Sequence, residues 1–152
     1  MELQDPFCDE GIYRQVFYES DKFIVVYNIH PILPGHSLII SKRHVLQMTE
    51  LNEEEFIDFA KVLKTVIPKL LKVYGADSYN LSVNSGEKSG AKVFHFHMHI
   101  VPRGRVKNFL EGNSEFYETL EEEKSIFKSD SNDIERNLQL LRKAFKYSQK
   151  RK

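Results

Sequence analysis

Apolar residues recur along this chain at two spacings, one typical of strands and the other of helices. Five short segments are rich in β-branched and aromatic residues and predict strands: 12–17, 22–28, 36–41, 79–84 and 94–101. Apolar residues recur mostly every three or four positions between 52 and 74, and again near 132–147, which predicts two main helices. Because the strands do not alternate regularly with helices, the pattern favours an α+β fold with an antiparallel sheet.

The long helix predicted at 52–74 carries its own boundary signals. Asn52 or Thr49 can cap its first turn, and Gly75 stands where a C-cap glycine is expected. Pro68 lies inside the pattern, and because proline removes a backbone donor we expect a kink at this position.

Length and composition fit one globular domain and narrow its partners. The chain has 152 residues, of which 41% are hydrophobic and 29% charged, so a single core is expected. The 22 basic residues balance the 22 acidic ones, which argues against a bulk electrostatic grip on nucleic acid or on an anionic membrane. No stretch approaches the roughly 20 apolar residues that span a bilayer, and no signal peptide is visible. Cys8 is the only cysteine, so no intramolecular disulfide can form and we expect a reducing, cytoplasmic setting.

The segment Val93–Arg103, VFHFHMHIVPR, places half of the six histidines within five positions. In a strand, alternate side chains share a face, so His95, His97 and His99 are expected in a row. The opposite face would carry the apolar residues that pack on the helices: Phe94, Phe96, Met98 and Ile100.

The residues alone leave three interpretations of this histidine row. It can be the exposed polar face of an amphipathic strand, although threonine would suit a strand better. Neutral imidazoles two positions apart can chelate one transition-metal ion. An imidazole, with an unperturbed pKa of about 6.5, can also act as a nucleophile near neutral pH.

Three blocks of the sequence resemble the motifs of the histidine-triad (HIT) superfamily. His95-Phe-His-Met-His99, followed by Ile-Val-Pro-Arg, is similar to the pattern H-φ-H-φ-H-φ-φ, in which φ is apolar. Residues 31–45 (PILPGHSLIISKRHV) resemble the block P-x-x-P-G-H-x-L-φ-φ-P-K-x-H-V, with Ser41 in place of a proline. Residues 84–90 (NSGEKSG) resemble the phosphate-side loop that precedes the triad. The match runs from about residue 5 to 103, so the chain is identified as a member of this superfamily.

The resemblance implies a fold and an assembly. We expect one HIT domain over 1–152, with its core at about 5–103 and a polar extension, 104–152, that contains a helix. The implied fold is a five-stranded antiparallel sheet with two main helices. Two subunits would join their sheets in a homodimer, with the helix at 52–74 at the contact.

The resemblance also implies nucleotide chemistry. His97 would attack the α-phosphorus of a nucleotide, and water would then hydrolyse the nucleotidyl-histidine intermediate. His99 would hydrogen-bond the phosphate or the leaving oxygen, whereas His36 would orient the triad unless it is only a buried structural histidine. The implied catalytic residues are His36, His95, His97 and His99, and the implied substrate-binding residues are Asn28 and Ile29 at the ribose and Asn84, Gly90 and Lys92 at the phosphates. No cofactor is required for this covalent chemistry, although Mg²⁺ can accompany a polyphosphate.

Features of two branches of the superfamily are combined in this chain. Asn28 and the segment 113–122, which resembles a Fhit motif containing Tyr117, favour a Fhit-like hydrolase of diadenosine tri- or tetraphosphate. Asn84, where Fhit proteins carry glutamine, is closer to the Hint-type nucleoside phosphoramidases. A diadenosine polyphosphate phosphorylase and a nucleotide-binding signalling protein with slow turnover remain as further alternatives.

A second site is implied near the N-terminus. Many relatives hold zinc with two cysteines of a C-x-x-C motif, a histidine of the P-K-x-H block and the first triad histidine. The corresponding residues here are Asp5, Cys8, His44 and His95, so a carboxylate replaces one thiolate. The alternatives are a structural zinc site or a vestigial site in which Cys8 is simply packed.

Other residues are candidates for contacts with the base or the phosphates. Phe17, Tyr27 and Leu38 can adjoin a base, although each is equally expected in the core. Six cations near the motifs can form a positive funnel for a polyphosphate: Lys42, Arg43, Lys88, Lys92, Arg103 and Arg105.

Overall fold

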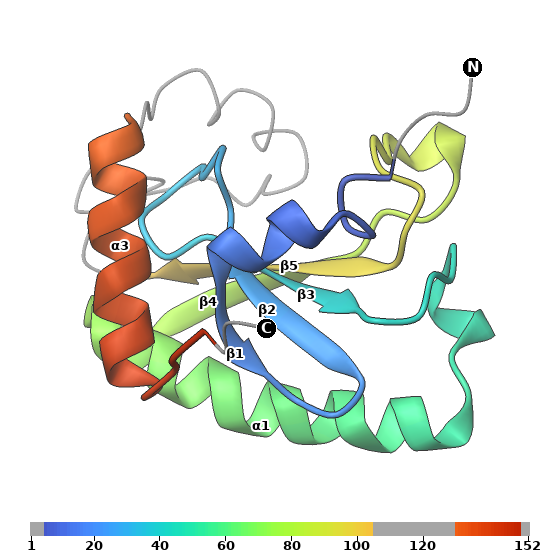
Figure 1. Cartoon of the computed structure of the whole chain (residues 1–152), viewed down its shortest axis with the longest axis horizontal. Coiled ribbons are helices and arrows are strands. Elements are labelled where there is room, and N and C mark those ends of the chain that lie inside the picture. Colours follow the sequence, from blue (N-terminus) through green and yellow to red (C-terminus); the bar gives the residue numbers. More distant parts are fainter. Residues whose placement is uncertain (1–4, 105–129, 150–152) are drawn as a thin grey trace.

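The computed structural model describes residues 5–104 and 130–149, which form one antiparallel sheet with helices packed on it (Figure 1). The strands run in the spatial order β1-β2-β3-β5-β4. Their bounds are Val16–Glu19 for β1, Phe23–Tyr27 for β2, Ser37–Ser41 for β3, Ser78–Ser82 for β4 and His97–Arg103 for β5. All four neighbouring pairs are antiparallel, which confirms the predicted α+β class and five-stranded sheet.

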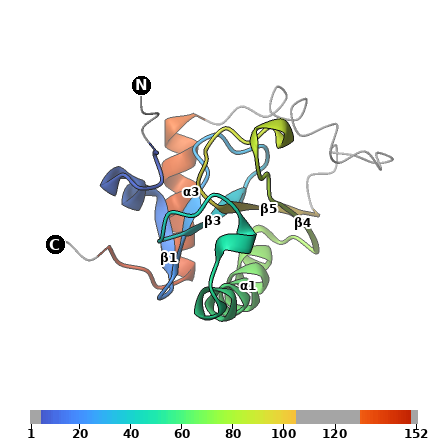
Figure 2. The same ribbon diagram turned by 90° about the vertical axis from the view of Figure 1, so that its right-hand side faces the viewer.

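Two α-helices, α1 (Glu53–Tyr74) and α3 (Ser131–Ala144), cover one face of the sheet. The main core lies between them and the sheet, where Phe59, Val66 and Leu141 pack against apolar strand residues. The short 3₁₀ helix η1 (Glu10–Gln15) lies on the opposite face, over a smaller apolar cluster (Figure 2). The remaining 3₁₀ helices are η2 (Met48–Glu50) and η3 (Glu87–Ser89).

Helix α1 begins and ends where the sequence predicts. The Asn52 side chain accepts from the Glu55 N–H at 2.9 Å, and the Glu55 carboxylate accepts from the Asn52 N–H at 3.0 Å. Gly75 follows the last turn with φ of 60°, a conformation that costs glycine little. The helix is unbroken across Pro68, which is exposed, so water can bond the carbonyl that loses its donor; a bend there stays a prediction.

Two strands begin later than predicted. Residues 10–15 form η1 rather than a strand, because the Asp9 side chain accepts from the Gly11 N–H at 2.6 Å and starts a helical turn. Strand β5 begins at His97, so His95 and Phe94 precede it, and Phe94 is 43% exposed instead of packing on the helices. The Phe96 N–H donates to the Val45 carbonyl in the loop that follows β3. Of the predicted row of three histidines, His97 and His99 therefore lie in the strand and His95 precedes it.

The register of β3 and β5 fixes the face on which those two histidines lie. His97 is paired with Ile40 and His99 with Leu38, and both apolar partners belong to the cluster under η1. Paired residues of an antiparallel ladder share a face. His97 and His99 thus lie on the side opposite α1, while Met98 between them enters the main core, as predicted.

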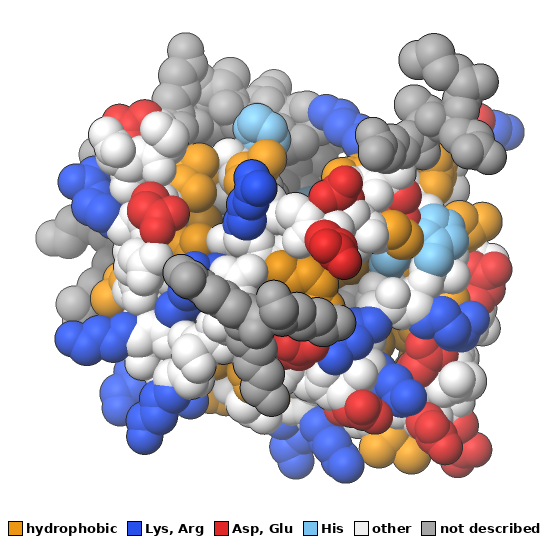
Figure 3. Space-filling model, viewed as in Figure 1, with side chains coloured by type: hydrophobic (Ala, Val, Ile, Leu, Met, Phe, Trp, Pro, Cys, Tyr) orange, Lys and Arg blue, Asp and Glu red, His pale blue; other side chains and the backbone are white. Residues whose placement is uncertain are grey.

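The surface seen in Figure 3 mixes basic and acidic side chains without a large patch of either sign. This is the distribution expected for a chain with equal numbers of the two. Within residues 5–104 and 130–149, no helix combines the length and apolar character needed to cross a membrane.

Candidate functional site

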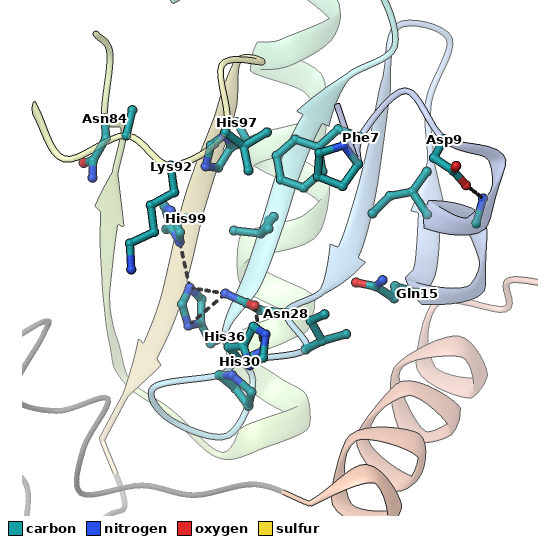
Figure 4. A pocket seen from close by; sticks show the side chains of 18 of the residues that line it. Phe7, Asp9, Gln15, Asn28, His30, His36, Asn84, Lys92, His97 and His99 are labelled. Atoms are coloured by element: carbon teal, nitrogen blue, oxygen red, sulfur yellow. Dashed lines mark hydrogen bonds between the residues drawn. The ribbon is translucent and has the colours of Figure 1, made fainter. Parts of the chain in front are cut away.

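A cavity of about 1040 Å³ opens on the face of the sheet that carries His97 and His99 (Figure 4). It extends from the loop before β5, past the two histidines, to η1. Eight of the predicted site residues line it: Asn28, Ile29, His36, Asn84, Gly90, Lys92, His97 and His99. Segments far apart in the sequence thus contribute to one pocket.

His97 is held in a single tautomer by the backbone. Its Nδ1–H donates to the carbonyl of His95 at 2.7 Å, which leaves Nε2 with a lone pair. The side chain is 8% exposed, and this burial lowers the pKa of the imidazole, although the bond to the carbonyl opposes the shift. A neutral imidazole with an unprotonated nitrogen is the form that can act as a nucleophile.

His36 and His99 form a directed pair beside this nitrogen. The Ile32 N–H donates to Nδ1 of His36 at 3.1 Å, so a neutral His36 carries its proton on Nε2. That nitrogen lies 2.8 Å from Nδ1 of His99 and donates to it. His99 then carries its own proton on Nε2. His36 is 1% exposed and contacts His99 from within the protein, so this geometry supports both a buried structural histidine and the orienting role, which stays a prediction.

The end of the pocket near β4 offers groups suited to phosphate. Asn84, Gly90 and Lys92 line it, together with His97 and His99 (Figure 4). Gly90 has a φ of 84°, which few other residues adopt without strain. An amide, a lysine and a loop of this kind provide donors and one positive charge.

Among the five funnel candidates that the structure describes, Lys92 alone lines this cavity. Lys42 pairs with Glu19 at 2.7 Å, and Arg43 pairs with Glu55 at 2.7 Å. Lys88 is exposed on η3, Arg103 donates to Asn80, and neither lines the pocket. Arg105 lies outside the described residues. Carboxylates and an amide thus contact three of these cations, and Lys92 is the described one that lines the cavity; a wider funnel stays a prediction.

The opposite end of the pocket is largely apolar. Phe7, Ile12, Ile29 and Leu38 line it together with the polar side chain of Gln15. The Phe7 ring stands edge-on to the His97 ring, with centroids 4.9 Å apart. Such a slot between apolar side chains suits a flat aromatic ligand.

Sequence reasoning found only part of this apolar end. Leu38 was a candidate neighbour of a base, but Phe17 and Tyr27 are buried in the main core on the other face and do not line the pocket. Phe17 and Tyr27 therefore follow the core alternative, because strand alternation turns those two side chains toward the helices. Ile12 and Gln15 were missed because a strand was predicted where η1 forms, although Asp9 with glycine two residues later is a turn signal.

His95 does not line the pocket; it belongs to a second cluster beside it. Its Nε2 lies 2.6 Å from the Ser41 carbonyl, and its Nδ1 lies 2.7 Å from Oδ2 of Asp5. The same carboxylate oxygen is 2.7 Å from Nδ1 of His44, and Sγ of Cys8 is 3.6 Å from both imidazole nitrogens. The four potential ligand atoms all lie within 4.8 Å of one another, so these residues could hold a metal ion.

Hydrogen bonds set the charges in this cluster. Burial by itself raises the pKa of the Asp5 carboxyl, but bonds from Cys8, His95, the Phe7 N–H and His44 together hold it well below its usual range. The hydrogen bond to Asp5 raises the pKa of the Cys8 thiol to about 11. Asp5 is therefore an anion that gathers the other three side chains around it.

The donor set fits zinc. Tetrahedral zinc places nitrogen and oxygen ligands about 3.3 Å apart and a nitrogen about 3.6 Å from a sulfur ligand. The two sulfur–nitrogen distances already have that value, and the carboxylate would have to retreat by roughly 0.6 Å. The Ser41 carbonyl supplies the outer contact that commonly orients a ligating imidazole.

Comparison with known proteins gives related sequences over most of the described chain. A bis(5'-adenosyl)-triphosphatase of Saccharomyces cerevisiae is 38% identical over 96 residues, which cover 62% of this chain and 47% of that protein. A bifunctional bis(5'-adenosyl)-triphosphatase/adenylylsulfatase of Arabidopsis thaliana is 32% identical over 130 residues, which cover 83% and 71% of the two chains. The chain thus spans about half the length of the yeast relative that it matches.

Solved structures share the fold. A hypothetical histidine triad nucleotide-binding protein of Sulfolobus tokodaii superposes with a TM-score of 0.69 at 27% identity and covers 92% of this chain and 91% of its own. A Zn-bound histidine triad family protein of Mycobacterium smegmatis gives 0.64 at 26% identity, with 86% and 83% covered. Residues 10–106 match the HIT domain, and they carry the two pocket histidines and His36. This chain belongs to the HIT domain family.

Proposed function

We propose that this protein is a nucleotide hydrolase that cleaves dinucleoside polyphosphates, diadenosine tri- or tetraphosphate, at the α-phosphate through a nucleotidyl-His97 intermediate. The observation that carries the proposal is the state of His97, a buried neutral imidazole whose unprotonated Nε2 stands in a cavity large enough for a nucleotide. The printed names of the yeast and Arabidopsis relatives support the substrate class.

In the first step, Nε2 of His97 forms a bond to the α-phosphorus while the bond from that phosphorus to the bridging oxygen breaks. The remaining nucleotide leaves with the bonding electrons. The Nε2–H of His99 donates to a phosphate oxygen, and Lys92 and Asn84 face the charge on the others. Positioning and electrostatics thus supply most of the acceleration.

In the second step, water adds to the phosphorus and the bond to His97 breaks. The nucleoside monophosphate leaves, and the imidazole returns to its neutral form. The backbone bond from Nδ1 to the His95 carbonyl is retained throughout, so the same nitrogen is presented for the next cycle. Inorganic phosphate in place of water would give a nucleoside diphosphate, which is the phosphorylase alternative.

Ribose binding is assigned to Asn28 and Ile29 at the middle of the pocket. The Asn28 carbonyl oxygen accepts from the His30 N–H at 2.9 Å, which turns its amide nitrogen toward His36 and the cavity. An amide held in this way can donate to a ribose hydroxyl. Any Mg²⁺ would arrive with the polyphosphate rather than on protein ligands.

We assign a structural zinc to Asp5, Cys8, His44 and His95. Bound there, zinc would act as a cross-link and not as a participant in phosphoryl transfer. The cluster ties the turn at residues 5–8 to the loops beside β3 and β5, and that turn carries Phe7 to the wall of the pocket. His95 would then act as a ligand rather than as a reacting group.

A homodimer and a cytoplasmic setting complete the proposal. Strand β4 lies at one edge of the sheet with Tyr79 44% exposed, and α1 exposes Phe56 and Ile57. These features support a contact in which two sheets join beside α1. The single cysteine supports a reducing compartment.

Asn84 stands where Fhit proteins carry glutamine, and it lines the pocket on its phosphate side. This residue favours one alternative, a Hint-type nucleoside phosphoramidase. The competing substrates decide between the two. Purified protein is incubated with diadenosine triphosphate, diadenosine tetraphosphate and an adenosine phosphoramidate, with and without inorganic phosphate. Products are separated by chromatography, and quenched enzyme is weighed by intact mass spectrometry.

Release of AMP together with an adenylyl adduct that is absent from His97→Ala is the expected result. Formation of ADP only when phosphate is present would reassign the protein as a phosphorylase. Tight binding without turnover of any substrate would contradict hydrolysis and favour a nucleotide-binding role.

A further inference from the structure

Helix α3 belongs to the layer opposite the pocket, yet one of its side chains reaches the pocket wall. Leu138 and Leu141 bury α3 in the main core. Arg142, one position further on, instead donates to η1 and to the first residue of the edge strand β1. Figure 1 shows the end of α3 lying next to β1, so a long side chain can extend around that edge.

The guanidinium of Arg142 contacts three backbone carbonyls at the end of η1. Its Nε–H donates to the Val16 carbonyl at 2.9 Å. Its Nη2 donates to the Arg14 carbonyl at 2.9 Å and to the Tyr13 carbonyl at 3.3 Å. The Arg14 and Tyr13 carbonyls lie in the last turn of η1, where the Tyr13 carbonyl also accepts from the Val16 N–H. A planar fork of donors can contact several such carbonyls at once.

The contacts lie on both sides of Gln15. The carbonyl of the preceding residue and that of the following residue are both held, so the backbone of Gln15 is fixed from the outside. Its side chain enters the pocket, where it is a polar group among the apolar residues Ile12, Ile29 and Leu38 (Figure 4). Within the described residues, its amide forms no hydrogen bond.

The apolar cluster beneath η1 connects the same residues to the base end of the pocket. Ile12 and Leu38 belong both to this cluster and to the cavity lining, and Tyr147 packs against the cluster from the end of the chain. The Arg142 guanidinium lies 5.8 Å from the centre of the Tyr147 ring, within reach of a cation–π contact. Arg142 therefore contacts both η1 and Tyr147, which lie around the apolar cluster that also lines the pocket.

We propose that Arg142 is a positioning residue for the nucleobase end of the pocket, and that the group it positions, the Gln15 amide, contacts the hydrogen-bonding edge of an aminopurine. The inference rests on the proposed function, since it assumes that a nucleotide occupies the cavity. A carboxamide donates and accepts in one plane, which matches the amino group and adjacent ring nitrogen of adenine. The element that holds it, α3, lies outside the residues matched by the family.

The test measures binding rather than turnover. AMP and purine riboside 5'-monophosphate, which lacks the 6-amino group, are titrated into the wild type, Arg142→Gln, Arg142→Lys and Gln15→Leu. Arg136→Gln is the matched control, because Arg136 lies on the same helix, is exposed and pairs only locally with Asp133. Because one or two hydrogen bonds are involved, we expect the wild type to prefer AMP by about tenfold.

The preference should fall to about twofold or less in Gln15→Leu and Arg142→Gln, remain partly in Arg142→Lys, and be unchanged in the control. In Arg142→Gln, KM for the dinucleotide should rise while kcat stays within about twofold, because the phosphate end is untouched.

Three results would overturn the inference. They are equal binding of the two ligands by the wild type, an undiminished preference in Arg142→Gln, or a loss of kcat and binding together in proportion to a fall in Tm. The last result would leave Arg142 a purely structural cap. Absence of dinucleotide hydrolysis by the wild type would contradict the proposed function alone, because the AMP preference is measured independently of turnover.

Discussion

Two histidine clusters lie side by side in this protein, and they differ in what their rings face. His97 donates to a backbone carbonyl and presents a bare nitrogen to a cavity. His95, two residues earlier, is buried between the Ser41 carbonyl and the Asp5 carboxylate and faces a cluster of potential metal ligands. The start of β5 between them separates the two environments.

The contrast teaches that hydrogen-bond partners, and not sequence position, set the chemistry of each ring. A neutral carbonyl partner leaves an imidazole free to act as a nucleophile. A carboxylate and a second imidazole within 3 Å of each other make a site for a cation. The clusters nevertheless touch through Phe7, whose ring is in edge contact with both His95 and His97.

The largest expected effect comes from removing each of the two histidines in turn and comparing the losses of activity. His97→Ala should lower kcat for dinucleotide hydrolysis by roughly 10⁴-fold or more, since the proposed nucleophile is lost. His95→Ala should retain much more activity, because the carbonyl that orients His97 belongs to the backbone and survives. Steady-state kinetics with Tm measured for both variants tests the contrast. Equal losses of kcat in two folded variants would show that His95 also reacts.

A substitution at His36 tests whether this buried residue, by orienting His99, affects the rate of the chemical step. In His36→Gln the directed donor to His99 is altered while a polar group still fills the space. We expect kcat to fall about 10- to 100-fold with a smaller change in KM, the usual size for a group that orients a functional imidazole. Single-turnover kinetics measures the chemical step. An unchanged rate of adduct formation would assign His36 a structural role only.

The metal cluster should affect stability more than chemistry. At zinc concentrations about 100 times the dissociation constant, binding to the folded state alone adds about 2.7 kcal/mol, or roughly 5–10 °C in Tm for a chain of this size. Differential scanning fluorimetry with zinc and with a chelator measures the shift. Asp5→Ala should abolish it, whereas Asp58→Ala, a carboxylate on α1 away from the cluster, should not. A shift that persists in Asp5→Ala would place the metal elsewhere.

The sequence predicted the sheet, the two helices and the eight pocket residues better than the chemistry of individual rings. Alternation and helical spacing report burial, so elements such as α1 with its Asn52 cap followed directly. The start of β5 did not, because it depends on a backbone bond from Phe96 to the loop residue Val45 that no local pattern encodes. Gln15 was missed because a strand was predicted where η1 forms, and Phe7 because a long-range contact places its ring beside His97. The segment 113–122, which contains Tyr117 and resembles a Fhit motif, lies outside the described residues.

The smallest expected effect concerns Phe7, whose ring contacts both His95 and His97. Burial lowers the pKa of His97, so its neutral form persists to lower pH than in a free histidine, and the acid limb of kcat/KM should have its midpoint below about 6.5. Phe7→Ala would admit water beside the ring and weaken this desolvation, so the midpoint should move upward, toward 6.5, by less than about one unit. A pH–rate profile of both proteins measures the change, with Leu140→Ala, an exposed apolar residue of α3, as control. A midpoint that moves downward in Phe7→Ala would mean that contact with the metal cluster, and not burial by Phe7, governs the ionisation of the nucleophile.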